Sequence, residues 1–329
     1  MKNRKKLIEV KGLKKYFPIK KSVFQRTNSF VKAVDGISFD LYKGETLGLV
    51  GESGCGKTTI GRTMLRLLEP TAGQIFFDNI NITSLTQKEL RPIRTKMQII
   101  FQDPYSSLNP RMNVGDMLSE ALHVHKIVPR DMISKEVKRL LDIVGLASNH
   151  ANRYPHEFSG GQRQRIGIAR ALSVQPELIV CDEAVSALDV SIQAQIINLL
   201  KDLQKEFDLT YLFITHDLSV VGYISDRVAV MYAGKIHELA KSKDLFEDPL
   251  NPYTKALLDS IPKIGKKTDK SILLKGVVSS VDNQNEGCSL CSRFNPVDCA
   301  CGGTGIEPDL NEVKPNHFVR CDPNILKTI

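Results

Sequence analysis

The sequence of 329 residues lacks any apolar run long enough to cross a bilayer. Its apolar stretches, such as residues 178–181, have the length of a strand, whereas a membrane-spanning helix needs roughly 20 apolar residues. The basic residues at the N-terminus are not followed by an apolar segment of the secretory type. We therefore expect no transmembrane helix and no signal peptide, and a location in the cytoplasm.

Internal repeats and low-complexity tracts are also absent, which argues against a repeat architecture.

Acidic residues are scarce at the start of the chain. Residues 1–32 hold eleven Lys or Arg against one acid, Glu9, so this segment carries +10 and the remainder −2 of the net +8. Such a segment either contacts an anionic membrane face or is a solvated loop. No basic-aromatic module accompanies it, so no nucleic-acid partner is expected.

The pattern up to residue 240 predicts an α/β domain with a mainly parallel sheet, because short β-branched runs alternate with helical periodicity. Strands are predicted at residues 7–11, 37–41, 46–50, 97–101, 178–182, 211–215 and 227–231. Helices are predicted at residues 57–68 and 192–206, and a helical subdomain at about 103–174 with segments at 113–126, 131–146 and 160–174. We assign residues 1–243 to this domain and 244–329 to a C-terminal extension that begins with a Pro-interrupted helix around 251–258.

A glycine-rich stretch follows the predicted strand at 46–50 and precedes the helix at 57–68. Its glycines allow close approach of backbone N–H groups to phosphate, Lys57 can reach the β- and γ-phosphates, and the Thr58 hydroxyl suits Mg²⁺. A glycine-rich turn without a ligand is the alternative. The expected nucleotide-binding residues here are Gly51, Glu52, Ser53, Gly54, Cys55, Gly56, Lys57, Thr58 and Thr59.

Two carboxylates end the apolar run at 178–181. Ligands of open α/β sheets bind at the carboxyl ends of strands. Asp182 is therefore expected to hold Mg²⁺, and Glu183 to polarise the attacking water. A merely solvent-exposed acidic strand end is the alternative.

A second anion site is predicted where Ser159, Gly160, Gly161 and Gln162 begin a helix. This site cannot easily serve the chain's own phosphate, which the loop around Lys57 already encloses.

Together these motifs, in this order over residues 7–240, resemble the ATP-binding subunits of ABC transporters. The resemblance implies that Tyr16 stacks on adenine, that Gln102 binds Mg²⁺ and senses the membrane subunit, and that His216 contacts the γ-phosphate. It further implies that residues 159–162 are the signature and that residues 186–189, ending at Asp189, cross between subunits. From the residue types alone, Tyr16 can instead be a packing residue, Gln102 a strand cap and His216 a structural histidine.

In the resembled family, the signature of one subunit closes on the γ-phosphate that a partner holds, so ATP hydrolysis requires a dimer. Lys57, Gln102, Glu183 and His216 are the catalytic residues that this implies, with ATP and Mg²⁺ as cofactors.

Residues 102–112 and 251–257 closely resemble the ATPases of oligopeptide and dipeptide importers, and the insertion at residues 19–31 resembles the second of their two ATPase subunits. The implied partners are a second ATPase subunit, two membrane permeases and an extracytoplasmic binding protein, with this chain peripheral on the cytoplasmic face of the membrane. Nickel importers are close relatives, so the cargo stays open. A soluble ABC ATPase is the less favoured alternative, because relatives of that kind usually have two motif sets or a long coiled coil, neither of which is seen here.

Five of the seven cysteines lie near the C-terminus. Four of them could hold a [4Fe–4S] cluster, as the resemblance suggests, or zinc, and loose thiols are the third alternative. Their spacing departs from the family pattern, which leaves the ligand set open and also leaves room for a redox-sensing role. Cys55 and Cys181 are expected to be packing residues. The five clustered residues are Cys288, Cys291, Cys299, Cys301 and Cys321.

Overall fold

The computed structural model describes residues 4–19, 30–261, 288, 290, 301 and 307–320, without the side chains of Pro104 and Ser106. The chain divides into two compact units. Unit 1 comprises Met1–Lys6, Leu41–Glu45 and Ser84–Ile214. Unit 2 comprises Leu7–Asp40, Thr46–Thr83 and Thr215–Ile329.

Unit 1 contains three parallel strands in the order β8, β7, β6. Every residue of β7 and β8 is buried, which explains why both read as continuous apolar runs in the sequence. In register, Met97 lies opposite Leu178, and Leu178 opposite Thr210. The strands are β6 (Met97–Ile100), β7 (Leu178–Asp182) and β8 (Thr210–Ile214).

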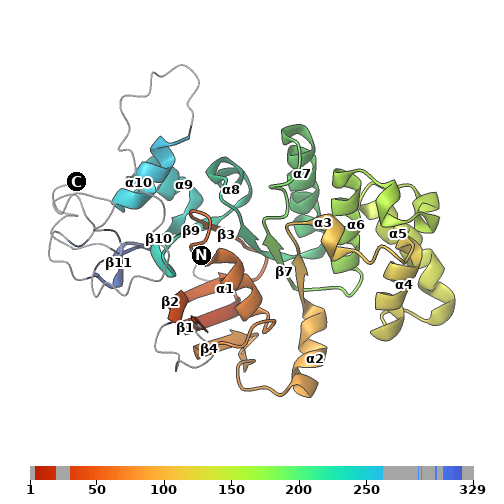
Figure 1. Cartoon of the computed structure of the whole chain (residues 1–329), viewed down its shortest axis with the longest axis horizontal. Helices are drawn as coiled ribbons and strands as arrows, with labels where there is room; N and C mark the ends of the chain where they lie inside the picture. Colours follow the sequence, from red (N-terminus) through yellow and green to blue (C-terminus); the bar gives the residue numbers. More distant parts are fainter. Residues whose placement is uncertain are drawn as a thin grey trace. The chain divides into compact units, whose positions relative to one another are not determined.

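The helices of unit 1 include the predicted helical segments. α4, α5 and α6 pack on one another, and Figure 1 shows them gathered at one side of the view. α5 turns one apolar face inward, burying Val137, Leu140 and Leu141. The α-helices are α2 (Gln87–Lys96), α3 (Pro104–Ser107), α4 (Val114–Val124), α5 (Ile133–Ile143), α6 (Gly160–Leu172) and α7 (Val190–Phe207). Short 3₁₀ helices span Arg130–Met132, Ser148–Asn152 and Pro155–Glu157.

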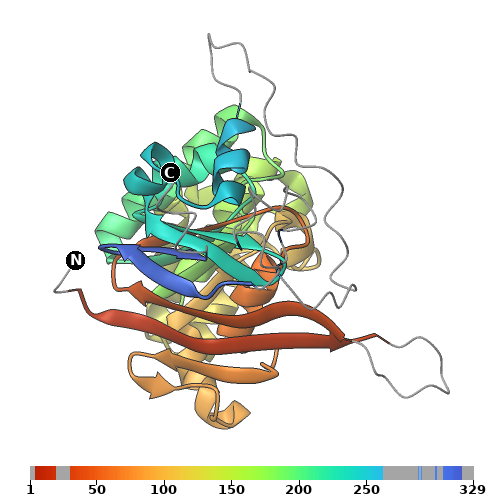
Figure 2. The same cartoon turned by 90° about the vertical axis from the view of Figure 1, so that its left-hand side faces the viewer.

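Unit 2 has two groups of strands. The first follows the order β11, β12, β10, β9, β3, of which only β3 and β9 are parallel. The second is a four-stranded sheet in the order β2, β1, β4, β5, and Figure 2 shows its long strands β1 and β2 side by side. The strands are β1 (Lys6–Pro18), β2 (Phe30–Tyr42), β3 (Thr46–Val50), β4 (Ala72–Phe77), β5 (Ile80–Asn81), β9 (Arg227–Tyr232), β10 (Lys235–Lys241), β11 (Leu310–Lys314) and β12 (His317–Arg320).

The expectation of a mainly parallel sheet is therefore only partly right. The segments predicted at 7–11 and 37–41 are strands, but they belong to the separate sheet, in which β1 pairs antiparallel with β4. Local apolar patterning predicts that a strand forms, whereas its pairing partner depends on the tertiary structure.

The helices of unit 2 include α1, which follows the phosphate loop, and α10, which begins after Asn251. Pro252 stands at the first position of α10, where its missing N–H costs no hydrogen bond, so it begins this helix and does not interrupt it. The helices are α1 (Lys57–Met64), α8 (Leu218–Ile224), α9 (Ser242–Glu247) and α10 (Pro252–Asp259).

The strands after residue 307 extend the sheet of β3, β9 and β10, because β12 pairs antiparallel with β10. A buried carboxylate, Glu238, holds this region together. It accepts hydrogen bonds from the backbone N–H groups of Leu250 (2.8 Å) and Asn251 (3.1 Å), and its Oε1 lies 2.7 Å from His317 Nε2. The residues beyond 243 thus share buried polar contacts with β10.

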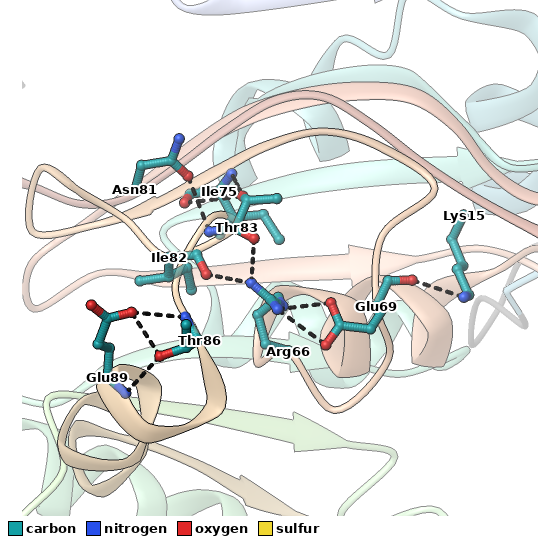
Figure 3. Close-up of polar contacts among 9 residues, drawn as sticks. All are labelled: Lys15, Arg66, Glu69, Ile75, Asn81, Ile82, Thr83, Thr86 and Glu89. Atoms are coloured by element: carbon teal, nitrogen blue, oxygen red, sulfur yellow. Dashed lines mark hydrogen bonds and ion pairs between the residues drawn. The ribbon is translucent and has the colours of Figure 1, made fainter.

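Arg66 fixes the end of α1 (Figure 3). Its guanidinium donates to the backbone carbonyls of Ile82 and Thr83, both at 2.5 Å, and forms an ion pair with Glu69 at 2.8 Å. The backbone carbonyl of Glu69 in turn accepts a hydrogen bond from Lys15 at 2.8 Å. The helix that carries Lys57 is thereby tied to β1 and to the segment after β5.

Candidate active site

The phosphate loop of unit 2 connects a buried strand to a helix. β3 is buried throughout and ends at Val50, and α1 begins at Lys57. Gly54 has φ +81° and open space where a Cβ would stand, and Gly56, the N-cap of α1, has φ +107°. This arrangement presents backbone N–H groups and a helix N-terminus to an anion, as expected for a phosphate cradle.

Close packing also requires two of these glycines. A Cβ at Gly51 would lie 2.1 Å from the carbonyl oxygen of Met231, and one at Gly56 would lie 2.0 Å from that of Ala33. Any side chain at either position would displace backbone of β9 or β2. The loop conformation is therefore set by its neighbours as well as by its own sequence.

Lys57 is buried, and its ammonium group lies inside the loop. Nζ donates hydrogen bonds to the carbonyl oxygens of Gly51 (2.8 Å) and Glu52 (2.9 Å). A buried cation of this kind is a suitable partner for phosphate oxygens.

The other loop residues differ in exposure. Ser53 is exposed, whereas Glu52, Thr58 and Thr59 are partly buried, the two threonines in the first turn of α1. Cys55 is buried, and burial raises the pKa of its thiol, so it is a protonated packing residue at neutral pH.

In unit 1, the two carboxylates stand at the carboxyl end of β7. Asp182 is buried, and Glu183 is partly buried with φ +49°. The backbone N–H of Glu183 donates to the carbonyl oxygen of Ile214 at 2.9 Å, which holds this conformation. Positive φ at a residue other than glycine is uncommon and is concentrated at functional sites.

Gln102 lies beside Glu183. Its side-chain Nε2 donates a hydrogen bond of 2.8 Å to Glu183 Oε2. Gln102 follows β6 and is exposed, so the contact joins the ends of two neighbouring parallel strands. The amide therefore orients a carboxylate, in addition to any contact of its carbonyl oxygen with a metal.

The segment at 186–189 starts from the same glutamate. The backbone N–H and the hydroxyl of Ser186 donate to the carbonyl oxygen of Glu183 at 3.2 and 3.0 Å. Asp189 is exposed at the N-cap of α7. A shift of this segment would thus act directly on the backbone of Glu183.

The signature residues begin α6. Ser159 is the N-cap and forms a capping box with Gln162: Ser159 Oγ accepts from the backbone N–H of Gln162 (3.4 Å), and Gln162 Oε1 accepts from that of Ser159 (3.1 Å). Ser159 and Gly160 are exposed, which leaves the helix N-terminus open to an anion.

Gly160 and Gly161 differ in their surroundings. A Cβ at Gly161 would lie 2.5 Å from Ile192 Cγ2, whereas one at Gly160 would be in ordinary contact with Leu188 Cδ2 at 3.5 Å. Gly161 is therefore needed for the close packing of α6 on α7. The packing within the chain does not require glycine at position 160, so a glycine there matters only for a group that binds from the solvent side.

In unit 2, His216 follows β8 and precedes α8. It is exposed, and its neighbour Asp217 caps α8 by accepting from the backbone N–H of Ser219 at 2.8 Å. The backbone N–H of Thr215 donates to the carbonyl oxygen of Leu49 at 3.2 Å, which places this turn beside β3. The exposed imidazole is thus not a core histidine.

Tyr16, on β1, is partly buried. Its hydroxyl donates a short hydrogen bond to Asp35 Oδ1. Burial, followed by the bond to the Asp35 carboxylate, raises the pKa of the Tyr16 hydroxyl well above its usual range. The ring therefore has a fixed hydroxyl and is not a core residue.

Two further residues contact this site, and no sequence motif marks their contacts. Asp35 orients Tyr16, and the hydroxyl of Tyr253 accepts a hydrogen bond of 3.4 Å from the backbone N–H of Glu52 in the phosphate loop. Tyr253 belongs to the stretch 251–257 that resembles the importer ATPases, but that resemblance does not indicate its contact with the phosphate loop. Nothing in the sequence around Asp35 signals its role.

Two of the clustered cysteines, Cys288 and Cys301, are buried, and Cys291, Cys299 and Cys321 lie outside the described residues. Within residues 4–19, 30–261, 307–320 and the three single positions, no group of three or more His, Cys, Asp or Glu is placed to hold a metal ion. Cys181 is fully buried, and burial raises the pKa of its thiol.

No helix in the described part of the chain has the length and apolar character needed to span a membrane.

Two family models match the sequence. Residues 34–186 match the ABC transporter family, and residues 237–301 match the C-terminal region of oligopeptide/dipeptide transporters.

Curated relatives cover almost the whole chain. It is 52% identical over 97% of its length, and 98% of the relative's, to the oligopeptide transport ATP-binding protein AppF of Bacillus subtilis. The figures for OppF of the same organism are 51% identity and 96% of each chain. A putative peptide import ATP-binding protein of Brucella ovis is 50% identical over 96% of this chain and 97% of its own.

The fold of this chain resembles those of solved structures. CbiO1 of Clostridium perfringens, part of an ABC transporter complex, has a TM-score of 0.64 and 29% identity, covering 74% of this chain and 91% of its own. The dimeric ATP-binding cassette MJ0796, in a post-hydrolysis state with ADP and Pi, has a TM-score of 0.63 and 27% identity. The match covers 71% of this chain and 98% of the MJ0796 chain.

Proposed function

Since this chain belongs to the oligopeptide transport ATP-binding proteins of the ABC transporter family, we propose that it is the ATP-hydrolysing motor subunit of a peptide importer. It works as a dimer with a second ATPase subunit, on two membrane permeases at the cytoplasmic face of the membrane. An extracytoplasmic binding protein delivers oligopeptides or dipeptides to those permeases.

The observation that carries ATP hydrolysis is the contact of Gln102 with Glu183. A carboxylate that is held in one orientation at the end of a buried strand is suited to accept a proton from water. Asp182 precedes it in unit 1, and we assign to its carboxylate the oxygen-ligand role that Mg²⁺ prefers, together with the Gln102 carbonyl. In unit 2, the Thr58 hydroxyl is an oxygen donor of the same kind.

The loop around Lys57 fits the phosphates of ATP. Gly54 and Gly56 adopt positive φ in this loop, and the Lys57 ammonium binds two of the loop's carbonyl oxygens. We propose that this loop binds the phosphates of ATP and that Tyr16 stacks on the adenine base. His216 would contact the γ-phosphate.

A second subunit is part of the chemistry. The α6 N-terminus at Ser159 and Gly160 is exposed, and its N–H groups suit an anion that the partner holds. The exposed Asp189 lies on the segment that is hydrogen-bonded to Glu183, so contact between subunits would reach the catalytic carboxylate.

A hollow in unit 1 suits the permease. It has a volume of about 390 Å³ and is lined by residues that include Met112, Met117, Val124 and Arg170. Arg170, on the signature helix α6, donates to the carbonyl oxygen of Ser107 at the end of α3, which follows Gln102. A segment seated in this hollow would therefore act on both Gln102 and the signature. In the importer complex, Val124→Glu should abolish peptide-stimulated ATPase activity and leave ATP binding unchanged.

The peptide cargo rests on the curated relatives and on the match of residues 237–301. Uptake of labelled di- and oligopeptides by vesicles that contain the whole complex tests it. Uptake of nickel instead of peptides would reassign the cargo and leave the ATPase role in place.

An iron–sulfur cluster, held by four of the five C-terminal cysteines, stays a proposal from the sequence alone. A [4Fe–4S] cluster requires four thiolate ligands, and of the five cysteines the structure describes Cys288 and Cys301, both of which are buried. Iron, sulfide and zinc analysis of protein purified without oxygen would separate a cluster from zinc or free thiols.

Glu183→Gln tests the motor function. It should keep ATP binding, reduce turnover by about 10²- to 10⁴-fold and trap a closed dimer, because general-base catalysis contributes about this much. Asp202→Asn, which removes an exposed carboxylate on α7, is the control and should change turnover less than about two-fold. Normal hydrolysis by Glu183→Gln would show that the base is another group.

A further inference from the structure

A chain of polar contacts within unit 2 runs from Tyr16 to the segment before β11. The Tyr16 hydroxyl donates to Asp35 Oδ1, and Asp35 Oδ2 lies 3.8 Å from Lys235 Nζ. Lys235 also forms a close ion pair with Glu307. Residues from β1, β2, β10 and the C-terminal segment are thus connected end to end.

These contacts are shielded from solvent. The side chains of Asp35, Lys235 and Glu307 are 20%, 25% and 10% exposed. Exposed ion pairs contribute little, because water and salt screen them, whereas shielded pairs hold their geometry better. The chain of contacts can therefore transmit a constraint from Glu307 to Tyr16.

Backbone contacts fix Asp35 next to the phosphate loop. Its N–H donates to the carbonyl oxygen of Gly234 at 2.8 Å, and the N–H of Gly234 donates to the carbonyl oxygen of Cys55 at 3.0 Å. The turn between β9 and β10, which precedes Lys235, thus contacts both Asp35 and the phosphate loop.

Tyr16 is held at both ends. Its backbone N–H donates to Thr71 Oγ1 at 2.9 Å, and its hydroxyl stays protonated at physiological pH as a donor to Asp35. Anchoring the hydroxyl oxygen fixes the direction in which the Tyr16 side chain extends. Because a phenolic O–H prefers the plane of its ring, donation to Asp35 also restrains that plane. A ring fixed in advance binds a stacked base with less loss of conformational entropy.

We propose that Asp35, Lys235 and Glu307 are positioning residues that hold the Tyr16 ring for stacking of the adenine base, so that the C-terminal segment sets the affinity for ATP. This inference rests on the proposed ATPase function. It gives the part of the C-terminal extension that carries Glu307 a role in nucleotide recognition. This role is separate from any metal that the cysteines of the extension bind.

The contacts predict which part of the nucleotide is affected. Base stacking on an aromatic ring strengthens binding by about 5- to 150-fold. Disturbing the ring should cost part of that factor, and it should leave the contacts of the triphosphate with the phosphate loop unchanged. Inorganic tripolyphosphate, which has no base, is therefore the matched probe for ATP.

The test is calorimetric titration of the full-length chain with MgATP and with magnesium tripolyphosphate. Asp35→Ala should weaken ATP binding by about 5- to 20-fold, and Glu307→Gln by about 2- to 5-fold, within the stacking contribution. Both should bind tripolyphosphate as the wild type does. In turnover assays of the assembled importer, KM for ATP should rise while kcat stays the same.

Asp309→Asn, which alters an exposed carboxylate two residues after Glu307, is the control and should change neither affinity. Unchanged ATP binding in Asp35→Ala and Glu307→Gln would overturn the inference, as would an equal loss for both probes. If Asp35→Ala fails to fold, Tyr16→Phe, which keeps the ring but loses the bond to Asp35, carries the test with the same expected pattern. A wild-type chain that binds neither probe would overturn the ATPase function itself.

Discussion

The side-chain amide of Gln102 donates a hydrogen bond of 2.8 Å to the carboxylate of Glu183, across the ends of the parallel strands β6 and β7. In unit 1 this contact lies at the start of two segments. Residue 102 leads into α3, which the signature helix holds through Arg170, and residue 183 leads into the segment at 186–189. The proposed catalytic carboxylate, that of Glu183, is thus linked to both the proposed permease contact and the proposed subunit contact.

Gln102→Glu would place two carboxylates at this distance. Because like charges disfavour joint ionisation, one carboxyl pKa should rise, so the pH dependence of turnover should move to higher pH and kcat should fall. Gln102→Ala, which adds no charge, should lower kcat without shifting the pH dependence of turnover. A pH–rate profile of the assembled ATPase measures the difference, and identical profiles for the two variants would argue against a direct contact.

Lys57→Ala should weaken ATP binding by about 10- to 100-fold, since hydrogen bonds to a charged group are worth about 1.5–3 kcal/mol. Lys43→Ala is the control. Lys43 is an exposed lysine whose ion-pair distances are 3.7 Å to Asp208 and 4.0 Å to Glu177, and such surface pairs contribute little. Equilibrium binding of MgATP distinguishes the two, and equal losses would show a non-specific charge effect.

Gly161→Ala should destabilise unit 1 by about 1–3 kcal/mol, because its Cβ would lie 2.5 Å from Ile192 and force α6 away from α7. Gly160→Ala should leave the free energy of unfolding nearly unchanged and should still lower turnover, since its methyl group would narrow the exposed anion site. Urea unfolding and ATPase assays on both variants test this. A stable Gly161→Ala protein would mean that α6 and α7 adapt easily.

Folding stability should fall as pH drops from about 6.5 to 4. Burial, with further contributions from Arg320 and Lys235, lowers the pKa of His237 to about 4, although Glu307 opposes this shift. The unfolded chain takes up the proton first, so the contribution of neutral His237, ~3 kcal/mol, is complete above pH 6.5 and is lost toward pH 4.

His237 packs against the rings of Tyr232 and Tyr253, with centroid distances of 5.9 and 6.4 Å, so phenylalanine fits the same surroundings. His237→Phe should therefore reduce the loss of unfolding free energy between pH 7 and pH 5. Urea denaturation at both pH values measures it, and an unaltered pH dependence would assign the acid sensitivity to other groups.

Local sequence predicted much of the fold. The strands at 46–50 and 178–182 agree with β3 and β7 residue for residue, and all three helical segments between 113 and 174 form helices. Their signals are local, since a buried parallel strand is a continuous apolar run and each helix has an apolar face. β10, β11 and β12 were missed, because their stability depends on pairing partners that the local pattern does not encode.

The sequence by itself determined which residue types stand at 51–59, 159–162 and 182–183, and these types suit the binding of phosphate, of a further anion and of Mg²⁺. The tertiary structure alone decided which residues orient them. Gln102 and Glu183 are 81 positions apart, and Asp35 and Lys235 are 200 apart. Such pairs meet only when strands pair and helices pack, because hydrogen bonds and ion pairs act over a few ångströms in space, whatever the separation along the chain.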